Sequence, residues 1–280
     1  MPLSTVSTSR FTRGLLCLTA LAFTAESLGA MEDQRPEGLN GATWQFGPLN
    51  RWAYTHMSEV LPSKTIRRGT AAPRPIVGLS DASDELSIHW QGSPAKLSHL
   101  MDAQYVDGLL IMKDGKAVFE RYAGTLTAER THLLWSVSKT ITGLTAASVA
   151  ADGLIDLDKT VGDYVPELAN SGWGPDSLRD ILDMRDGSQW NEDYAAADST
   201  VRRQDCADGL LTGAGCAGVP VTGNYVFLPA VGRMPGRRGN FVYKSGTTDV
   251  MAWVLEAATG KRVADLVSER IWRRIGAEQD

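Results

Sequence analysis

The chain has 280 residues, of which 43% are hydrophobic and 22% are charged, a composition typical of globular proteins. This length is enough for one large domain or two small ones, each with a sizeable core. The formal charge of −5 and the lack of a basic stripe argue against a nucleic-acid-binding protein, so no nucleic-acid partner is expected.

The first 29 residues have the pattern of a secretory signal peptide. Arg10 and Arg13 precede an apolar run over 14–25, and small residues follow near position 30. Because a bilayer span needs about 20 apolar residues, the run is too short for a stable membrane anchor. We expect residues 1–29 to be removed and residues 30–280 to form a periplasmic or secreted domain. The alternative is an N-terminus without structure.

Between residues 105 and 124 the sequence predicts a β-hairpin. The strand-like runs GLLIM and AVFERY flank Asp114-Gly115, a dipeptide typical of two-residue hairpin turns. A helix of small and apolar residues is expected next, over 137–152, because an Asp-Gly pair there provides the glycine that commonly ends a helix.

Three further helices are predicted in the second half of the chain. One covers 177–187, and the others cover 250–260 and 262–277, where apolar residues recur at helical spacing. The intervening segment, 188–240, is rich in Gly, Asp and aromatic residues, which favours active-site loops over core elements.

Two cysteines stand ten residues apart in a Gly-rich stretch. In an oxidising compartment Cys206 and Cys216 would close a short loop as a disulfide. Free thiols in the cytoplasm are the alternative. A secreted protein and a disulfide are mutually consistent predictions.

Several common catalytic systems are absent from the sequence. The four histidines form neither an HExxH motif nor a closely spaced ligand pair, so no metal site is expected. The G-x-S-x-G nucleophile turn, G-x-G-x-x-G and the P-loop are also missing, and no cofactor is indicated. A serine enzyme with this sequence would need a base other than histidine.

Ser136 and Lys139 stand three residues apart at the start of the helix expected over 137–152. Residues at this spacing share one helix face, and a lysine desolvated by apolar neighbours can accept a serine proton. Free N–H groups at the helix N-terminus would favour developing negative charge. A serine that merely caps the helix is the alternative. Spacing alone does not decide, since Ser93 and Lys96 repeat it in a short polar segment.

A second motif, Tyr243-Lys244-Ser245, lies in a Gly-flanked loop before the helix at 250–260. A Ser-x-x-Lys helix after a hairpin, with Tyr-x-Ser about a hundred residues later, resembles the serine β-lactamase and penicillin-binding-protein superfamily. The stretches PLNRWAYTHM, VLPSKTIRRG, LLWSVSKTITG, ILDMRDGSQWNEDY and FVYKSGTTDVMAWVLE resemble its class C-like esterase branch, which includes 6-aminohexanoate-dimer (nylon oligomer) hydrolases. Together they cover most of 45–277.

The resemblance implies an α+β, β-lactamase/transpeptidase-like fold: an antiparallel sheet flanked by helices, with a second subdomain of helices and loops. It also implies a serine hydrolase that forms an acyl-enzyme on small esters or short linear amides. Ser136 would be the acylated nucleophile, Lys139 would lower its proton affinity, and Tyr243 would be a general acid and base.

The same resemblance implies three substrate contacts. In this branch a mobile loop carries a tyrosine that closes over an amide substrate, and Tyr194, 58 residues past Ser136, takes that place. Asp205 falls where the branch can carry an acid that holds the substrate's amino end. Ser245 would add a secondary polar contact. Ordinary exposed loop residues are the alternative for Tyr194 and Asp205.

The chain departs from the family pattern after the last predicted helix. The family's sheet also uses C-terminal strands, one with a Lys-Thr-Gly or His-x-Gly-like motif that supplies an oxyanion-hole N–H, and nothing after residue 243 resembles it. We therefore expect a C-terminally incomplete domain with an unpaired hairpin. Losing one oxyanion donor costs on the order of 10²–10³ in rate. Robust hydrolysis of a p-nitrophenyl ester by residues 30–280 would contradict this expectation.

The two motifs leave other functions open. Ser-x-x-Lys and Tyr-x-Ser are shared by esterases, β-lactamases and D-Ala-D-Ala carboxypeptidases. A truncated, catalytically inactive binding protein is the alternative from a different class. The motifs indicate neither the true substrate nor the oligomeric state.

Overall fold

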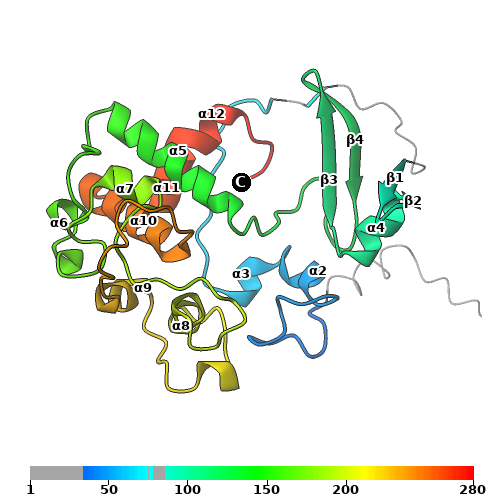
Figure 1. The fold of residues 1–280 in the computed structure, drawn as a ribbon. Coiled ribbons are helices and arrows are strands. Elements are labelled where there is room, and N and C mark those ends of the chain that lie inside the picture. Colours follow the sequence, from blue (N-terminus) through cyan, green and yellow to red (C-terminus); the bar gives the residue numbers. More distant parts are fainter. Residues whose placement is uncertain (1–33, 75, 78–85) are drawn as a thin grey trace, which may run out of the picture. The chain divides into compact units, whose positions relative to one another are not determined.

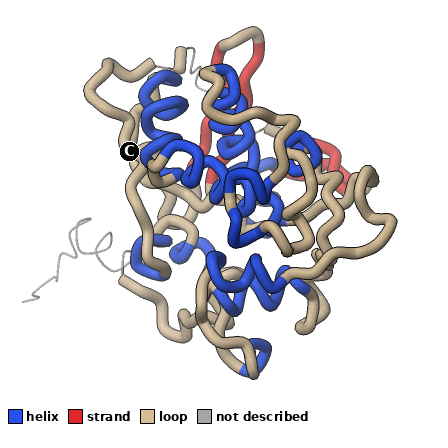
Figure 2. Tube along the Cα trace, turned by 90° about the vertical axis from the view of Figure 1, so that its left-hand side faces the viewer, coloured by secondary structure: helices blue, strands red, loops and turns tan. Residues whose placement is uncertain are grey.

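Two short antiparallel hairpins and a set of helices make up the part of the chain that the computed structural model describes, residues 34–74, 76–77 and 86–280 (Figure 1). The predicted signal peptide lies outside these residues. Helices and loops account for most of the trace and strands for little of it (Figure 2). Both sheets are antiparallel, so the predicted α+β class is confirmed.

The predicted hairpin is formed by β3 (Gly108–Lys113) and β4 (Lys116–Tyr122). Gly108 lies opposite Tyr122 and Lys113 opposite Lys116, with a register shift after Ile111. Asp114 and Gly115 have φ values of 51° and 75°. These left-handed angles are what a two-residue hairpin turn requires and what Asp and Gly tolerate.

The second Ser-x-x-Lys copy lies in a strand rather than in a helix. β2 (Ser93–Lys96) pairs with β1 (Ser87–Trp90) and is followed by α4 (Leu97–Ala103). Side chains three residues apart in a strand point to opposite faces of the sheet. Ser93 and Lys96 therefore do not form the pair that the same spacing produces in a helix.

The predicted helices are present with changed boundaries. α5 (Val137–Ala151) ends as expected before Gly153, which has a φ of 71°. α10 (Ser245–Thr259) begins five residues earlier than predicted and ends at the left-handed Gly260. The C-terminal helix is divided into α11 (Val263–Val267), a π-helical turn η4 (Ser268–Trp272) and α12 (Arg273–Ile275).

Two predictions for the middle of the chain were wrong. α7 (Leu178–Leu182) stops five residues before the predicted end at 187, since Met184 has a φ of 54°, which no helix accommodates. The segment 188–240 also contains α8 (Thr200–Ala207) and α9 (Asn224–Phe227). The remaining short elements are α2 (Asn50–Ala53), α3 (Met57–Val60), α6 (Val161–Tyr164), η1 (Pro166–Leu168), η2 (Ala214–Cys216) and η3 (Leu228–Ala230).

The main hydrophobic core lies around α10. One face of this helix packs against α5, α6 and α7, and α11 and η4 pack on α5 (Figure 1). Val250, Val254 and Leu255 of α10 are fully buried there together with Trp173. This packing fixes the N-termini of α5 and α10, where the two predicted catalytic motifs stand.

Candidate active site

Ser136 occupies the N-cap position of α5 without acting as a cap. Its side chain makes no capping hydrogen bond, and Lys139 Nζ instead donates to Ser136 Oγ at 2.9 Å. The preceding residue, Trp135, has a φ of 46°, a strained value for a bulky side chain. Strain of this kind persists only where the surroundings hold it, so the turn before Ser136 is a defined structure that directs the hydroxyl towards the lysine.

An aromatic cluster holds this turn. Trp44 stacks on Trp135 with ring centroids 5.6 Å apart, and Tyr54 meets the same ring edge-on at 5.8 Å. Trp44 is itself buried and donates its indole N–H to the Leu210 carbonyl at 2.8 Å. The orientation of the Ser136 turn therefore depends on segments far away in the sequence.

A histidine–carboxylate pair supports the same segment from the other side. His132 Nε2 lies 3.1 Å from Asp107 Oδ2, and Arg51 Nε lies 3.2 Å from the other oxygen of this buried carboxylate. The His132 ring also meets Tyr54 edge-on at 5.5 Å. The hydrogen bond to Asp107 raises the pKa of His132 above its usual value, although burial opposes it.

Lys139 connects the two motifs. Its Nζ lies 5.0 Å from the centroid of the Tyr243 ring, so the structure brings Ser136, Lys139 and Tyr243 together. Lys139 is only partly buried. The reason is that this face of α5 opens onto a cleft instead of packing against another element.

The fully buried lysine is the neighbouring Lys244. Its Nζ donates to Asp186 Oδ1 at 2.7 Å and to the Asp186 carbonyl at 2.6 Å. Both side chains are completely inaccessible to solvent. Asp186 also accepts hydrogen bonds from the hydroxyls of Ser188 and Thr247, at 2.5 and 3.0 Å. This network anchors the backbone between Tyr243 and Ser245, a role that no sequence pattern indicated.

Glu192 links the loop that contains Tyr194 to the segment 243–245 at the start of α10. Its carboxylate accepts from the Ser245 hydroxyl at 2.5 Å, the Ser245 N–H at 2.9 Å and the Tyr194 hydroxyl at 2.7 Å, and from the Trp190 indole. Burial alone would raise the pKa of Glu192, but these hydrogen bonds hold it below the usual value. Burial and Glu192 together raise the pKa of Tyr194 to about 12. The Ser245 hydroxyl is thus engaged with Glu192.

A cleft of about 760 Å³ collects most of the predicted site residues. Ser136, Lys139, Tyr194, Asp205 and Ser245 all line it. Its apolar wall comes mainly from Trp44, Phe46, Met57, Leu61, Leu133, Trp135 and Leu210. The ring of Tyr243 lies against Lys139 but does not line the cleft itself.

One end of the cleft is acidic. Asp205 is joined there by Asp208 and Asp249, which the sequence analysis did not single out. Burial and neighbouring carboxylates raise the pKa of Asp205 and the pKa of Asp249 to about 6. The charge of Arg202 lowers the pKa of Asp205, and a hydrogen bond from Gln204 lowers the pKa of Asp249, but the effect of burial is larger. A cationic group of a ligand would be favoured at this end of the cleft.

The structure joins Cys206 to Cys216 in a disulfide, with Cα atoms 5.4 Å apart. The bond fastens the end of α8 to the Gly-rich loop that follows it. Within the described ranges, no group of three or more His, Cys, Asp or Glu side chains is arranged to hold a metal ion. None of the described helices is long and apolar enough to cross a membrane.

Comparison with known proteins finds one family and several relatives. The Beta-lactamase family model matches residues 95–279. A 6-aminohexanoate-dimer hydrolase of Paenarthrobacter ureafaciens is 33% identical over 240 residues, 85% of this chain and 58% of that protein. A solved structure from Bacillus anthracis, described as a candidate 6-aminohexanoate-dimer hydrolase, is 27% identical with a TM-score of 0.75, covering 88% of this chain and 64% of the other. The chain thus spans less than two thirds of each relative.

Lys244→Met should destabilise the fold by about 3–5 kcal/mol, because it leaves the Asp186 carboxylate buried without its partner. Urea unfolding measures this loss. Lys261→Met is the matched control, since Lys261 forms an exposed ion pair with Glu269 and should cost about 0–1 kcal/mol. Equal losses in the two variants would show that the Lys244 network does not hold the loop.

His132 should make stability depend on pH. Because its pKa is raised on folding, its contribution is fully present below about pH 6.5, the unfolded value, and is lost as pH rises through the folded value. The difference in unfolding free energy between the wild type and His132→Gln should therefore shrink from pH 5.5 to pH 8.5. The acidic residues of the cleft titrate in both proteins and cancel in this difference. A pH-independent difference would contradict the prediction.

Proposed function

The chain belongs to the beta-lactamase family, and from this premise we propose that it is a serine hydrolase that forms an acyl-enzyme at Ser136 on small esters or short linear amides. The observation that carries the proposal is the 2.9 Å contact between Lys139 Nζ and an Oγ that caps nothing. A serine kept only as a helix cap would hydrogen-bond to the first turn of α5. The β-lactamase/transpeptidase-like fold supports the same assignment.

In the proposed mechanism, Ser136 Oγ attacks the substrate carbonyl carbon while Lys139 Nζ accepts the proton of the hydroxyl. The positive end of α5 favours the negative charge that develops on the carbonyl oxygen. Tyr243, whose ring lies against Lys139, gives a proton to the leaving amine or alcohol and regains one from Lys139. Water then attacks the acyl carbon and gives a proton to Tyr243. Tyr243 passes a proton to Lys139, and Lys139 passes one to Ser136 Oγ as the bond between this oxygen and the acyl carbon breaks.

The proposed substrates are linear and carry a positive charge. The acidic end of the cleft favours an ammonium group, and Asp205 is the carboxylate assigned to hold it. Tyr194 would close over the chain between this end and Ser136, with its hydroxyl oriented by Glu192. Ser245, already bound to Glu192, would act mainly by fixing that loop. By its name the Paenarthrobacter relative acts on 6-aminohexanoate dimer, a linear amide of this kind.

The proposed location is the periplasm or the extracellular space. Two features support it: the signal-like pattern of residues 1–29, and the disulfide between Cys206 and Cys216, which persists in oxidising compartments. We propose a small-molecule partner only.

Ser136→Ala should lower the hydrolysis of p-nitrophenyl butyrate and of 6-aminohexanoate dimer by at least about 10³-fold, since it removes the hydroxyl that Lys139 contacts. Ser93→Ala is the matched control, because it removes the serine of the second Ser-x-x-Lys copy, and it should leave the rate unchanged. Initial rates of the purified full chain provide the test.

Three results would overturn the assignment. Equal activity of the wild type and Ser136→Ala would exclude Ser136 as the nucleophile. Turnover of nitrocefin in place of both linear substrates would identify a β-lactamase instead. A wild type that hydrolyses none of these compounds and is not acylated by penicillin would support a binding protein.

A further inference from the structure

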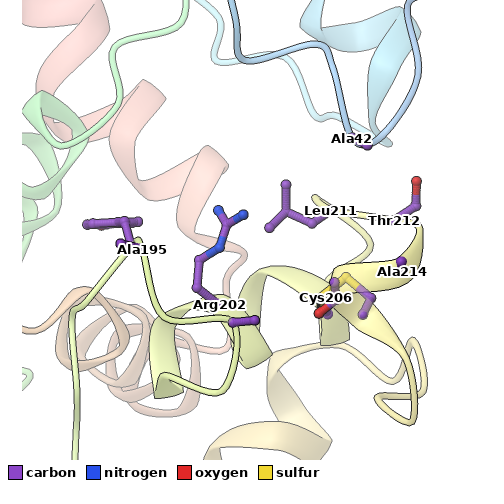
Figure 3. Close-up of a pocket in the computed structure, with 11 residues that line it drawn as sticks. Ala42, Ala195, Arg202, Cys206, Leu211, Thr212 and Ala214 are labelled. Carbon is purple, nitrogen blue, oxygen red and sulfur yellow. Dashed lines mark hydrogen bonds between the residues drawn. A yellow bond between two sulfur atoms is a disulfide. The ribbon is translucent and has the colours of Figure 1, made fainter.

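The loop that the Cys206–Cys216 disulfide closes lies against the segment before α2. Figure 3 shows Thr212 of this loop between Ala42 and the disulfide. The Thr212 N–H donates to the Gly41 carbonyl at 3.3 Å. A Cβ on Gly41 would lie 2.2 Å from the Thr212 hydroxyl oxygen, so the backbone at this glycine touches the threonine side chain directly. Any movement of the loop would therefore be passed to the segment before α2.

The disulfide is the covalent link between this loop and α8. Among the described residues, the backbone-to-backbone hydrogen bonds of 213–221 all run within that segment and reach no other part of the chain. A pocket of about 330 Å³ is lined by Arg202 of α8 on one side and by Ala214 and Gly215 of the loop on the other. Because an open chain adopts more conformations than a closed ring, breaking the disulfide would release the loop.

Leu210 is the point at which the loop meets the buried aromatic cluster. Its carbonyl oxygen accepts the indole N–H of Trp44 at 2.8 Å, and its side chain packs against the cluster that contains Trp44. Trp44 is almost completely buried, and a buried N–H donor requires an acceptor. A loop that moves away would leave this N–H without a partner or draw the Trp44 ring after it.

Trp44 in turn supports the turn that precedes Ser136. Its ring stacks on Trp135, with 13° between the two ring planes. Trp135 combines a φ of 46° with 42% exposure to solvent. Its strained backbone therefore depends on the contacts of its covered side, which are those to Trp44 and Tyr54. Since Ser136 is the next residue, a change in this turn alters the approach of its hydroxyl to Lys139.

We propose that the disulfide and Trp44 position Ser136, and that reduction of the disulfide lowers the reactivity of this nucleophile. The inference rests on the proposed function, because it takes Ser136 as the acylated residue. The connection runs from the disulfide to Leu210, from there to Trp44, and through Trp135 to Ser136. Trp44 acts here as a positioning residue, since it works through Trp135 and not on the reacting atoms.

The reducing step is a thiol–disulfide exchange with a dithiol. One thiolate of the dithiol attacks a sulfur of the protein disulfide and forms a mixed disulfide, which the second thiolate then resolves. The dithiol gives up two electrons and two protons and becomes a cyclic disulfide. The protein bond gains them and becomes two thiols, which leaves the loop open.

The test is the rate at which a fluorophosphonate probe labels Ser136 in the full chain, before and after treatment with dithiothreitol. Alkylation and mass spectrometry verify that Cys206 and Cys216 are thiols after the treatment. Circular dichroism verifies that the reduced chain is folded at the assay temperature. Reduction should slow the labelling at least about 5-fold, the effect of losing about one hydrogen bond.

Two tryptophan variants locate the connection. Trp44→Phe keeps an aromatic ring against Trp135 but removes the N–H that Leu210 accepts. Its oxidised form should label at least about 3-fold more slowly than the wild type. Reduction should then change its rate less than about 2-fold, because the connection is already broken. Trp253→Phe is the matched control, since Trp253 packs on Tyr225 instead, and it should keep the wild-type rate and the full response.

A variant without the disulfide controls for the reductant itself. The double substitution Cys206→Ala and Cys216→Ala should label at the rate of the reduced wild type, with or without dithiothreitol. If this variant does not fold, the oxidised and reduced forms of the wild type and of Trp44→Phe still give the complete comparison.

Two results would overturn the inference: a wild-type labelling rate that reduction does not change, or a response of Trp44→Phe as large as that of the wild type. Equal slowing of Trp44→Phe and Trp253→Phe would also contradict it, because a general loss of packing would then explain both. Absence of a label on Ser136 in every form would overturn the proposed function. Labelling of Ser136 that ignores the disulfide would count against this inference alone.

Discussion

The buried ion pair between Lys244 and Asp186 is the interaction on which the site depends most. It lies in the main core, with no exposure to solvent, and joins positions 58 residues apart in the sequence. A buried charge is tolerated only when it is paired and hydrogen-bonded, so Lys244 must lie beside Asp186. This contact fixes the position of the loop before α10. That position places Tyr243 on one side of the anchor, beside Lys139, and Ser245 on the other, beside Glu192.

Around this anchor the site is assembled from two helix N-termini and one loop. α5 brings Lys139 next to Ser136, the start of α10 and the residues before it bring Tyr243 and Ser245, and Glu192 connects Tyr194 to Ser245. The contacts of Ser136 and of Glu192 are short hydrogen bonds, whereas Lys139 meets Tyr243 through the face of its ring at 5.0 Å. The geometry of Ser136 and Lys139 is therefore supported by a rigid helix, while Tyr194 lies on a loop.

Local patterns predicted much of this, and long-range contacts explain what they missed. The Asp-Gly turn, the small-residue helix after Ser136 and the Tyr-x-Ser motif are all visible within a few residues of sequence. The pair of Lys244 and Asp186 is not, since Lys244 is the middle residue of the Tyr-x-Ser motif and its partner stands 58 residues earlier, where no local pattern links the two. The partial exposure of Lys139 could not be predicted either, since helical periodicity describes the face of a helix but not whether another element covers it.

The central claim is that Lys139 activates Ser136 within this assembled site. Its most direct test is the rate of covalent labelling by a fluorophosphonate probe, with the modified residue located by mass spectrometry. The account predicts a single label on Ser136, and a labelling rate at least about 10²-fold lower in Lys139→Met, whereas Lys96→Met, in the second Ser-x-x-Lys copy, labels like the wild type. A label on another serine, or equal rates for the two lysine variants, would contradict it.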